Sequence, residues 1–361
     1  MRKRHDENVA ASRVDPAPEA KMIRTIAASS VIGRHPEHDK RVSTAGRRIH
    51  TAMTEPRTRR AFLEALITGT AGLTITSSGF GQGRGPAPVT ASKLTDGIAV
   101  LSGAGGNVGV LVGSDGVLMI DGGIANRAMD VVAAATQISP RMVQALFNTH
   151  YHFDHVGSNE LLGMRGIRII AHENVKQRLM TTFENPAMGR RMDALAPAGL
   201  PTETFARTGR LMFGAETLEY THTPLAHTDG DAFVFFPAAN VLHTGDLFWT
   251  GRYPVVDYGV GGSLAGMAAT LEQMDKVGDA TTRIVPGHGI PGATKGDMRQ
   301  IREVWLAINQ RLEEHARQGR SADEVVAATP TRDFDLRIGV ANPEPFVRQA
   351  YGGVLAARTT R

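Results

Sequence analysis

Apolar residues recur in short runs along the first part of the folded chain, and glycine-rich turns separate these runs. The runs at 98–101, 108–112 and 116–120 are bounded by the turns 102–107 and 113–116. Short apolar runs with such boundaries predict β-strands, so the three runs predict a β-meander.

Helical spacing follows the third predicted strand. Residues 126–138 carry apolar positions at helical intervals until Pro140, and the apolar run 143–148 again predicts a strand. Further strands are predicted at 167–171, 210–221, 231–236 and 239–243, and further helices at 158–162, 172–183, 263–277, 295–317, 321–328 and 343–350. Residues 184–203 lack periodicity, so we interpret them as a plain connection or a lid. The order of elements indicates an α/β protein.

The amino-terminal region has a different character. Residues 1–52 are polar and arginine-rich, and we expect a disordered or mis-assigned extension, with Met53 as an alternative start. Residues 53–84 contain Thr58-Arg59-Arg60-Ala61-Phe62-Leu63 before a mildly apolar stretch, which resembles a twin-arginine export signal. An exposed basic helix start is the alternative. The resemblance implies the twin-arginine export machinery as a partner and a periplasmic or secreted location. We assign 85–92 to a linker and 93–361 to a single folded domain.

Charge and composition exclude several classes of site and partner. The chain has a net charge of +4, but residues 1–84 hold 15 Lys and Arg against 8 Asp and Glu, which leaves 25 against 28 in the rest. The part of the chain after residue 84 therefore has no excess of basic residues, and a nucleic-acid partner is not expected. The absence of cysteine excludes thiolate metal sites and cysteine nucleophiles. No apolar stretch approaches the ~18–20 residues of a membrane span.

The strongest candidate site directly follows the predicted strand 143–148. Four side chains that can bind metal lie within the six residues 150–155, called the hexad below: His150, His152, Asp154 and His155. Alternate residues of an extended segment point to one side, so His150 and His152 would face one cation. A turn would bring Asp154 and His155 to a second cation. The hexad therefore predicts a two-metal site.

Three further side chains stand at glycine-flanked turns beside predicted strands. They are His227 in Ala226-His227-Thr228-Asp229-Gly230-Asp231, Asp246 in Gly245-Asp246-Leu247-Phe248, and His288 in Pro286-Gly287-His288-Gly289. Residues at strand ends can converge at one edge of a fold although they are distant in sequence. His222 and His243 are interpreted as structural histidines or as supports of the metal ligands.

These motifs, together with Asp121 in Ile120-Asp121-Gly122-Gly123, resemble the metallo-β-lactamase superfamily over about residues 94–300. The resemblance implies a four-layered αβ/βα sandwich with the metal site at one edge of its two sheets. It implies one zinc held by His150, His152 and His227, a second held by Asp154, His155 and His288, and Asp246 as the bridge between them. Asp121 is expected to orient a ligand without binding metal.

The same resemblance implies a zinc-dependent hydrolase in which a metal-bound hydroxide attacks the carbonyl of a small molecule. Asp154 is the expected catalytic residue, because its carboxylate can orient the hydroxide or pass a proton. Among substrates we favour a cyclic amide such as a β-lactam, then a lactone or an ester. Asp246 stands where metallo-β-lactamases proper carry Cys or Ser, so lactamase activity is not implied.

Alternatives remain open at the level of the sequence. They are a thioester or phosphodiester hydrolase, a mononuclear-iron persulfide dioxygenase, and a non-catalytic binding module, with iron or manganese as alternative metals. Trp249, Tyr253 and Tyr258 follow Asp246 in a glycine-rich loop and either line the substrate cleft or pack in the core. The glycine-rich turn 103–107 is a candidate flap over the site.

Overall fold

The computed structural model describes residues 88–359, so the predicted extension 1–52 and export signal 53–84 lie outside the described residues. Strand β1 (Thr90–Lys93) begins inside the predicted linker, ahead of the boundary at 93. It is a polar, largely exposed edge strand that pairs antiparallel with the next strand, and this explains why its composition resembles a linker. Within residues 88–359 no helix is both long and apolar enough to cross a bilayer.

The first sheet has seven strands in the order β1-β2-β3-β4-β5-β6-β9. After β1 these are β2 (Ile98–Ser102), β3 (Val108–Gly113), β4 (Gly116–Ile120), β5 (Val143–Phe147), β6 (Arg168–His172) and β9 (Glu203–Phe205). Strands β1 to β4 pair antiparallel through tight turns, whereas β4, β5, β6 and β9 pair in parallel. Parallel pairing requires crossovers, and these contain α2 (Ala128–Ile138), α3 (Asn159–Gly163) and α4 (Glu173–Leu179).

The second sheet has five strands in the order β10-β11-β12-β13-β14. They are β10 (Thr208–Phe213), β11 (Glu216–His222), β12 (Ala232–Phe236), β13 (Val241–His243) and β14 (Arg283–Val285). Only the last pair is parallel, and its crossover contains α5 (Leu264–Asp275). The chain then continues through α6 (Lys295–Arg317), α7 (Ala322–Ala327), α8 (Arg332–Ile338) and α9 (Glu344–Thr359).

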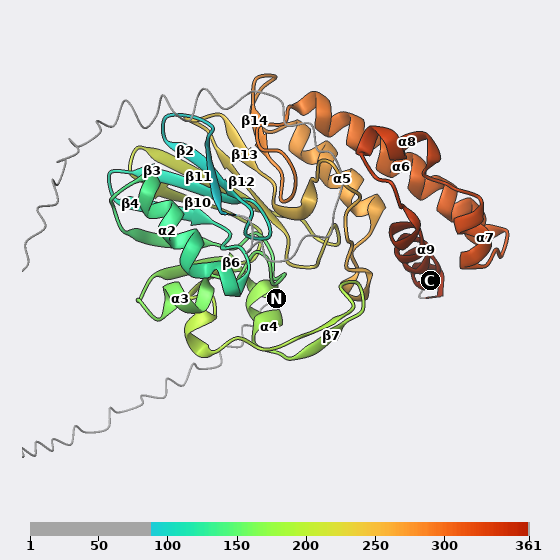
Figure 1. Cartoon of the computed structure of the whole chain (residues 1–361), viewed down its shortest axis with the longest axis horizontal. Coiled ribbons are helices and arrows are strands. Elements are labelled where there is room, and N and C mark those ends of the chain that lie inside the picture. Colours follow the sequence, from blue (N-terminus) through green and yellow to red (C-terminus); the bar gives the residue numbers. More distant parts are fainter. Residues whose placement is uncertain (1–87, 360–361) are drawn as a thin grey trace, which may run out of the picture. The chain divides into compact units, whose positions relative to one another are not determined.

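Three apolar clusters hold four layers together. Between the sheets, Phe147 and Leu118 of the first sheet pack with Val234 of the second. Helix α2 covers the outer face of the first sheet, and helices α5, α6 and α9 cover the second sheet around Trp305. Figure 1 shows α2 and α3 on one side of the strands and α5 and α6 on the other. The predicted four-layered α/β sandwich is therefore confirmed.

The site lies where several strands end. Parallel strands have their carboxyl ends at one edge of a sheet, so Asp121 after β4 and the hexad after β5 emerge side by side. The second sheet contributes Asp246 after β13 and His288 after β14, which also pair in parallel. Sheet topology alone thus collects the predicted side chains at one edge.

The structure adds elements that the sequence pattern does not predict. Residues 184–203 are not a plain connection, because β7 (Phe183–Asn185) and β8 (Arg190–Met192) pair there as a two-stranded hairpin. Helix α4 ends at Leu179, short of the predicted 183, since the chain turns into this hairpin. Helix α8 is also unpredicted. These elements are short, and their stability comes more from packing against other segments than from the local propensity of their own residues.

We predict that Trp305→Ala destabilises the fold by about 3–5 kcal/mol, because it empties the centre of the cluster between the second sheet and the C-terminal helices. Trp305 is 0% exposed, whereas its neighbour Leu306 on α6 is 42% exposed. Denaturant unfolding of both variants is the measurement, and Leu306→Ala should cost less than about 1 kcal/mol. Equal losses in the two variants would contradict this description of the core.

Candidate metal centre

Asp121 organises the start of the hexad. Its backbone adopts φ 65°, a left-handed conformation that costs a residue other than glycine about 1–3 kcal/mol. In this conformation its Oδ1 accepts the backbone N–H of Thr149 at 2.8 Å, and its Oδ2 accepts the Thr149 hydroxyl at 2.8 Å. The same Oδ2 lies 2.8 Å from Nδ1 of His155. Asp121 therefore occupies the place that its predicted orienting role requires.

One group of side chains that could hold a metal ion consists of His150, His152, His227 and Asp246. Each offers one ligand atom, and these atoms lie within 4.8 Å of one another. Nδ1 of His152 lies 2.9 Å from Nε2 of His227, which is 3.3 Å from Oδ2 of Asp246. Nε2 of His150 lies 3.6 Å from the same oxygen.

A second group consists of Asp154, His155 and His288, again with ligand atoms within 4.8 Å of one another. Nε2 of His288 lies 3.2 Å from Oδ2 of Asp154 and 3.4 Å from Nε2 of His155. Asp154 is the most exposed of the three, with 13% of its side chain accessible. The structure thus brings together all seven side chains that the sequence predicts as ligands.

Asp246 lies between the two groups. Its Oδ1 is 3.1 Å from Nε2 of His155, and its Oδ2 is 3.4 Å from Nε2 of His288 as well as close to His150 and His227. Gly287 permits this position, because a Cβ there would lie 2.0 Å from Oδ1 of Asp246. One carboxylate therefore faces both candidate cation positions.

The donor set fits divalent cations. Neighbouring ligand atoms on a tetrahedral zinc lie roughly 3.3 Å apart, given bond lengths of about 2.0–2.2 Å. Three pairs of ligand atoms have about this spacing: His227 and Asp246 at 3.3 Å, Asp154 and His288 at 3.2 Å, and His155 and His288 at 3.4 Å. Nε2 of His150 and Oδ1 of Asp154 and of Asp246 are buried without a hydrogen-bond partner among the described residues. Buried polar atoms normally have partners, so these atoms are free to bind cations.

Burial lowers the pKa values of the site histidines, whereas the neighbouring carboxylates raise them. Burial lowers the pKa of His227 to about 3 and lowers the pKa of His150 well below its usual range. Burial also lowers the pKa of His288, but the carboxylates of Asp246 and Asp154 outweigh it and raise that pKa to about 9. For His155 the charges of Asp246 and Asp121 likewise outweigh burial, so its pKa is well above the usual value.

The glycine-rich turn 103–107 crosses the site and is hydrogen-bonded on both sides. The backbone N–H of Gly106 donates to the carbonyl of Asp154 at 3.1 Å. The side-chain amide of Asn107 donates to the carbonyls of Pro286 at 2.9 Å and Gly289 at 3.1 Å. The candidate flap therefore joins the hexad to the loop that carries His288.

The three aromatic side chains after Asp246 divide between site and core. Trp249 packs on the ring of His288, with the ring centroids 4.3 Å apart. Tyr253 stacks on Phe346 of α9, and Tyr258 packs against the same apolar cluster. The core alternative therefore holds for the two tyrosines, while Trp249 forms a wall of the site.

Other histidines have structural contacts. His172 caps helix α4 by accepting the backbone N–H of Asn174 at 3.2 Å, and its ring stacks on His222 at 3.6 Å. His243 is buried and accepts the backbone N–H of Gly245 at 3.3 Å. Burial lowers the pKa of His243 to about 4.

Sequence reasoning missed two buried carboxylates that support ligands. Asp231 accepts the backbone N–H groups of His227 and Thr228, each at 2.7 Å, and so fixes the turn that presents His227. Asp257 lies 3.6 Å from Nε2 of His152, opposite the nitrogen that faces His227. The turn-forming residues around Asp231 could have indicated from the sequence that this carboxylate fixes the His227 turn. No local pattern marks Asp257.

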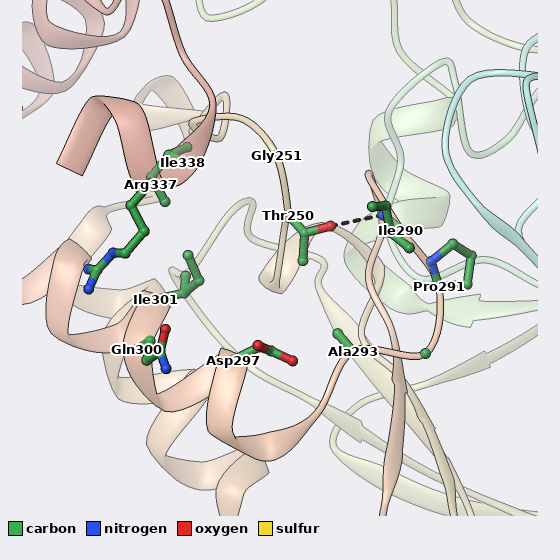
Figure 2. A pocket seen from close by; sticks show the side chains of 11 residues that line it. Thr250, Gly251, Ile290, Pro291, Ala293, Asp297, Gln300, Ile301, Arg337 and Ile338 are labelled. Atoms are coloured by element: carbon green, nitrogen blue, oxygen red, sulfur yellow. Dashed lines mark hydrogen bonds between the residues drawn. The ribbon is translucent and has the colours of Figure 1, made fainter. Parts of the chain in front are cut away.

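A separate cavity of about 390 Å³ lies beyond the loop that carries His288, and none of the seven candidate ligands lines it. Figure 2 shows Ile290 and Thr250 on one side of this cavity, with Asp297 and Arg337 on the helices around it. The backbone N–H of Ile290 donates to the Thr250 hydroxyl at 2.9 Å, and the N–H of Thr250 donates to the carbonyl of His288 at 3.1 Å. The wall of the cavity is therefore continuous with the His288 turn.

We predict that Gly106→Ala destabilises the protein by roughly 1–3 kcal/mol and displaces the His155 ring, because the added Cβ would lie 2.3 Å from its Cε1. Gly352→Ala is the matched control, since a Cβ there meets nothing within 4 Å and alanine favours the helix by up to about 1 kcal/mol. Thermal unfolding of both variants and a crystal structure of the first are the measurements. An undisplaced His155 would contradict the packing described for this turn.

Comparison with known proteins agrees with this architecture. A solved metallo-beta-lactamase from Pontibacter korlensis is 16% identical, with a TM-score of 0.51 over 60% of this chain and 99% of that one. A stereoselective inverting sec-alkylsulfatase from Pseudomonas sp. is 14% identical, with a TM-score of 0.55 over 74% of this chain and half of that longer one. At such identities the likeness shows the fold alone. The family model of the metallo-beta-lactamase superfamily matches residues 101–288, and this chain therefore belongs to that superfamily.

Proposed function

We propose that this chain is a dinuclear zinc hydrolase that cleaves a cyclic amide such as a β-lactam, a lactone or an ester. Members of its superfamily are mostly metal-dependent hydrolases. The observation that carries the proposal is the position of Asp246, whose two oxygens face both groups of candidate ligands. A mononuclear centre would leave one of these buried groups without a cation, so the geometry favours two ions over one.

In this proposal His150, His152 and His227 hold one ion, Asp154, His155 and His288 hold the other, and Asp246 serves both. Bound divalent ions polarise a carbonyl and lower the pKa of water from 15.7 toward about 7. Histidine and carboxylate donors suit zinc, and they leave iron and manganese as alternatives. The carboxylates Asp154 and Asp246 balance much of the positive charge.

Asp154 is the proposed catalytic residue. Burial alone would raise the pKa of its carboxyl, but the histidines 155 and 288 outweigh burial and keep that pKa below its ordinary value. The group is therefore a carboxylate at neutral pH and can accept a proton from an attacking water. Its partial exposure, 13% of the side chain, lets it reach a water or substrate that the other, buried side chains reach less easily.

Asp246 widens the range of substrates that the test must include. Because this residue replaces the Cys or Ser of metallo-β-lactamases proper, lactones, esters, thioesters and phosphodiesters belong in the test beside β-lactams. Export to the periplasm or beyond the cell remains a proposal that rests on the sequence of residues 53–84. Small molecules are the proposed partners of the catalytic domain.

We predict that the purified chain binds close to two zinc ions and hydrolyses at least one member of such a panel. His150→Ala should lower the rate by at least about a hundredfold, because it removes a donor whose Nε2 has no other partner among the described residues. Elemental analysis and steady-state kinetics are the measurements. His315→Ala is the control, since His315 lies on α6, outside both groups.

Two results would overturn this proposal. One iron per chain with oxygen uptake would instead indicate a persulfide dioxygenase. Unchanged biological activity in His150→Ala would indicate a binding module rather than an enzyme.

We also predict that zinc binding at pH 7 releases protons. A histidine must be neutral to bind metal, and His288 has a pKa of about 9 before it does so. Below pH 9 the ion therefore displaces a proton, so apparent zinc affinity rises with pH, by about tenfold per unit for each proton displaced. Calorimetric titration in two buffers of different ionisation enthalpy measures the release. Equal heats in both buffers would contradict this assignment of charge.

A further inference from the structure

A buried polar network lies behind His152, on the side away from the other candidate ligands. Its centre is Asp257, which is 1% exposed. Oδ2 of Asp257 accepts the hydroxyl of Tyr151 and the side-chain amide of Asn185, the latter at 2.7 Å, and lies 3.6 Å from Nε2 of His152. A carboxylate buried this deeply is costly unless its partners stabilise it, and here all three are groups that can donate a proton.

We propose that Asp257 is a positioning residue for His152, and that the C-terminal helix α9 holds Asp257 in place. The proposal rests on the proposed metal centre and names a part of the chain, residues 344–359, that lies beyond the family match at 101–288. It assigns this helix a role in cation affinity although it contributes no candidate ligand among the described residues.

The two ring nitrogens of His152 have different surroundings. Nδ1 faces the cation position, 2.9 Å from Nε2 of His227, and Nε2 faces Asp257. To bind a cation through Nδ1, the neutral ring must carry its proton on Nε2. Nε2 of His152 lies 3.6 Å from Oδ2 of Asp257, just beyond hydrogen-bond distance, and has no other partner among the described residues. The negative charge of this carboxylate, which accepts from Tyr151 and Asn185, attracts a proton on that nitrogen. Asp257 therefore favours the tautomer that turns the lone pair of His152 toward the cation.

Helix α9 reaches this network through one side chain. Oε1 of Gln349 accepts the backbone N–H of Val256 at 3.2 Å, and Nε2 of Gln349 donates to the carbonyl of Ala187 at 2.8 Å. Val256 precedes Asp257, and Ala187 lies in the β7–β8 turn, two residues after Asn185. Gln349 thus ties together the two segments whose side chains meet at the carboxylate.

Close packing leaves this arrangement little freedom. A Cβ at Gly353 of α9 would lie 2.0 Å from the ring of Tyr258, the residue after Asp257. The backbone N–H of Asp257 also donates to the carbonyl of His227 at 2.9 Å, which links the same loop to a second candidate ligand. A shift of α9 would therefore move the support of His152 and His227 together.

The test uses the full chain and two variants, Asp257→Asn and Gln349→Met. Asp257→Asn keeps the shape but removes the charge that orders the His152 ring, and we expect one of the two zinc ions to bind about 10–100-fold more weakly. Gln349→Met keeps the length but loses both hydrogen bonds, and we expect a smaller weakening at the same ion. Zinc affinity is measured by competition with a chromogenic chelator, and cobalt absorption spectra report the change in the ligand field.

Asp335→Asn is the matched control. Asp335 lies on α8 and accepts the hydroxyl of Tyr253 at 2.7 Å; Tyr253 belongs to the same loop as Asp257. Asp335 is a member of neither group of candidate ligands. Its zinc affinity and cobalt spectrum should match those of the unaltered protein. A structural role for Asp257 alone would lower the unfolding temperature of the zinc-free protein and leave the affinity of the folded variant unchanged.

The outcomes separate this proposal from the metal centre on which it rests. If the unaltered chain binds no zinc, the proposed function fails. If it binds two zinc ions and Asp257→Asn binds both with unaltered affinity, only the positioning role fails. If Asp257→Asn does not fold, the Gln349→Met variant provides the test. Unaltered zinc affinity and an unaltered cobalt spectrum in Gln349→Met would overturn the proposed role of α9.

Discussion

The structure depends on the burial of many ionisable groups at one edge of two sheets. His150, His152, His155, His227 and Asp246 are buried, and their ligand atoms face one another. Nε2 of His150 and Oδ1 of Asp246 have no hydrogen-bond partner among the described residues. Removing charges and polar atoms from water is costly unless something compensates. Divalent cations would satisfy the histidine nitrogens and the carboxylates together. The parallel strand pairs that bring these side chains to one edge therefore make sense as a scaffold for such ions.

Three buried carboxylates that belong to neither group each support a different histidine. Asp121 contacts the outer nitrogen of His155, Asp231 holds the backbone of His227, and Asp257 faces the outer nitrogen of His152. Each comes from a separate loop, after β4, before β12 and after β13. The fold therefore fixes the direction of the donors through a layer of acceptors behind them, which is the usual requirement for a well-defined metal site.

The sequence alone predicted the features that depend on neighbouring residues, such as the hexad and the long helix α6. The hexad places four donors within six residues. The predicted helix 295–317 agrees with α6, which the structure shows as a long helix with a capping box at Thr294. The β7–β8 hairpin, helix α8 and the role of Asp257 could not be predicted in this way. Asp257 owes its place to Tyr151, 106 residues earlier in the chain, and to Asn185, 72 residues earlier. Such contacts become visible only when the sheets are assembled.

The position of the C-terminal helices also affects which residues can meet a substrate. Because Tyr253 and Tyr258 pack against the cluster around α6 and α9, the loop after Asp246 offers Trp249 to the site and turns its tyrosines away. The opposite wall is the turn 103–107, which hydrogen bonds attach to the hexad and to the His288 loop. In the proposed hydrolase, the metal ligands set the type of reaction, and the side chains of these two walls select the substrate. Helix α9 influences one wall, because it packs against the loop that carries Trp249.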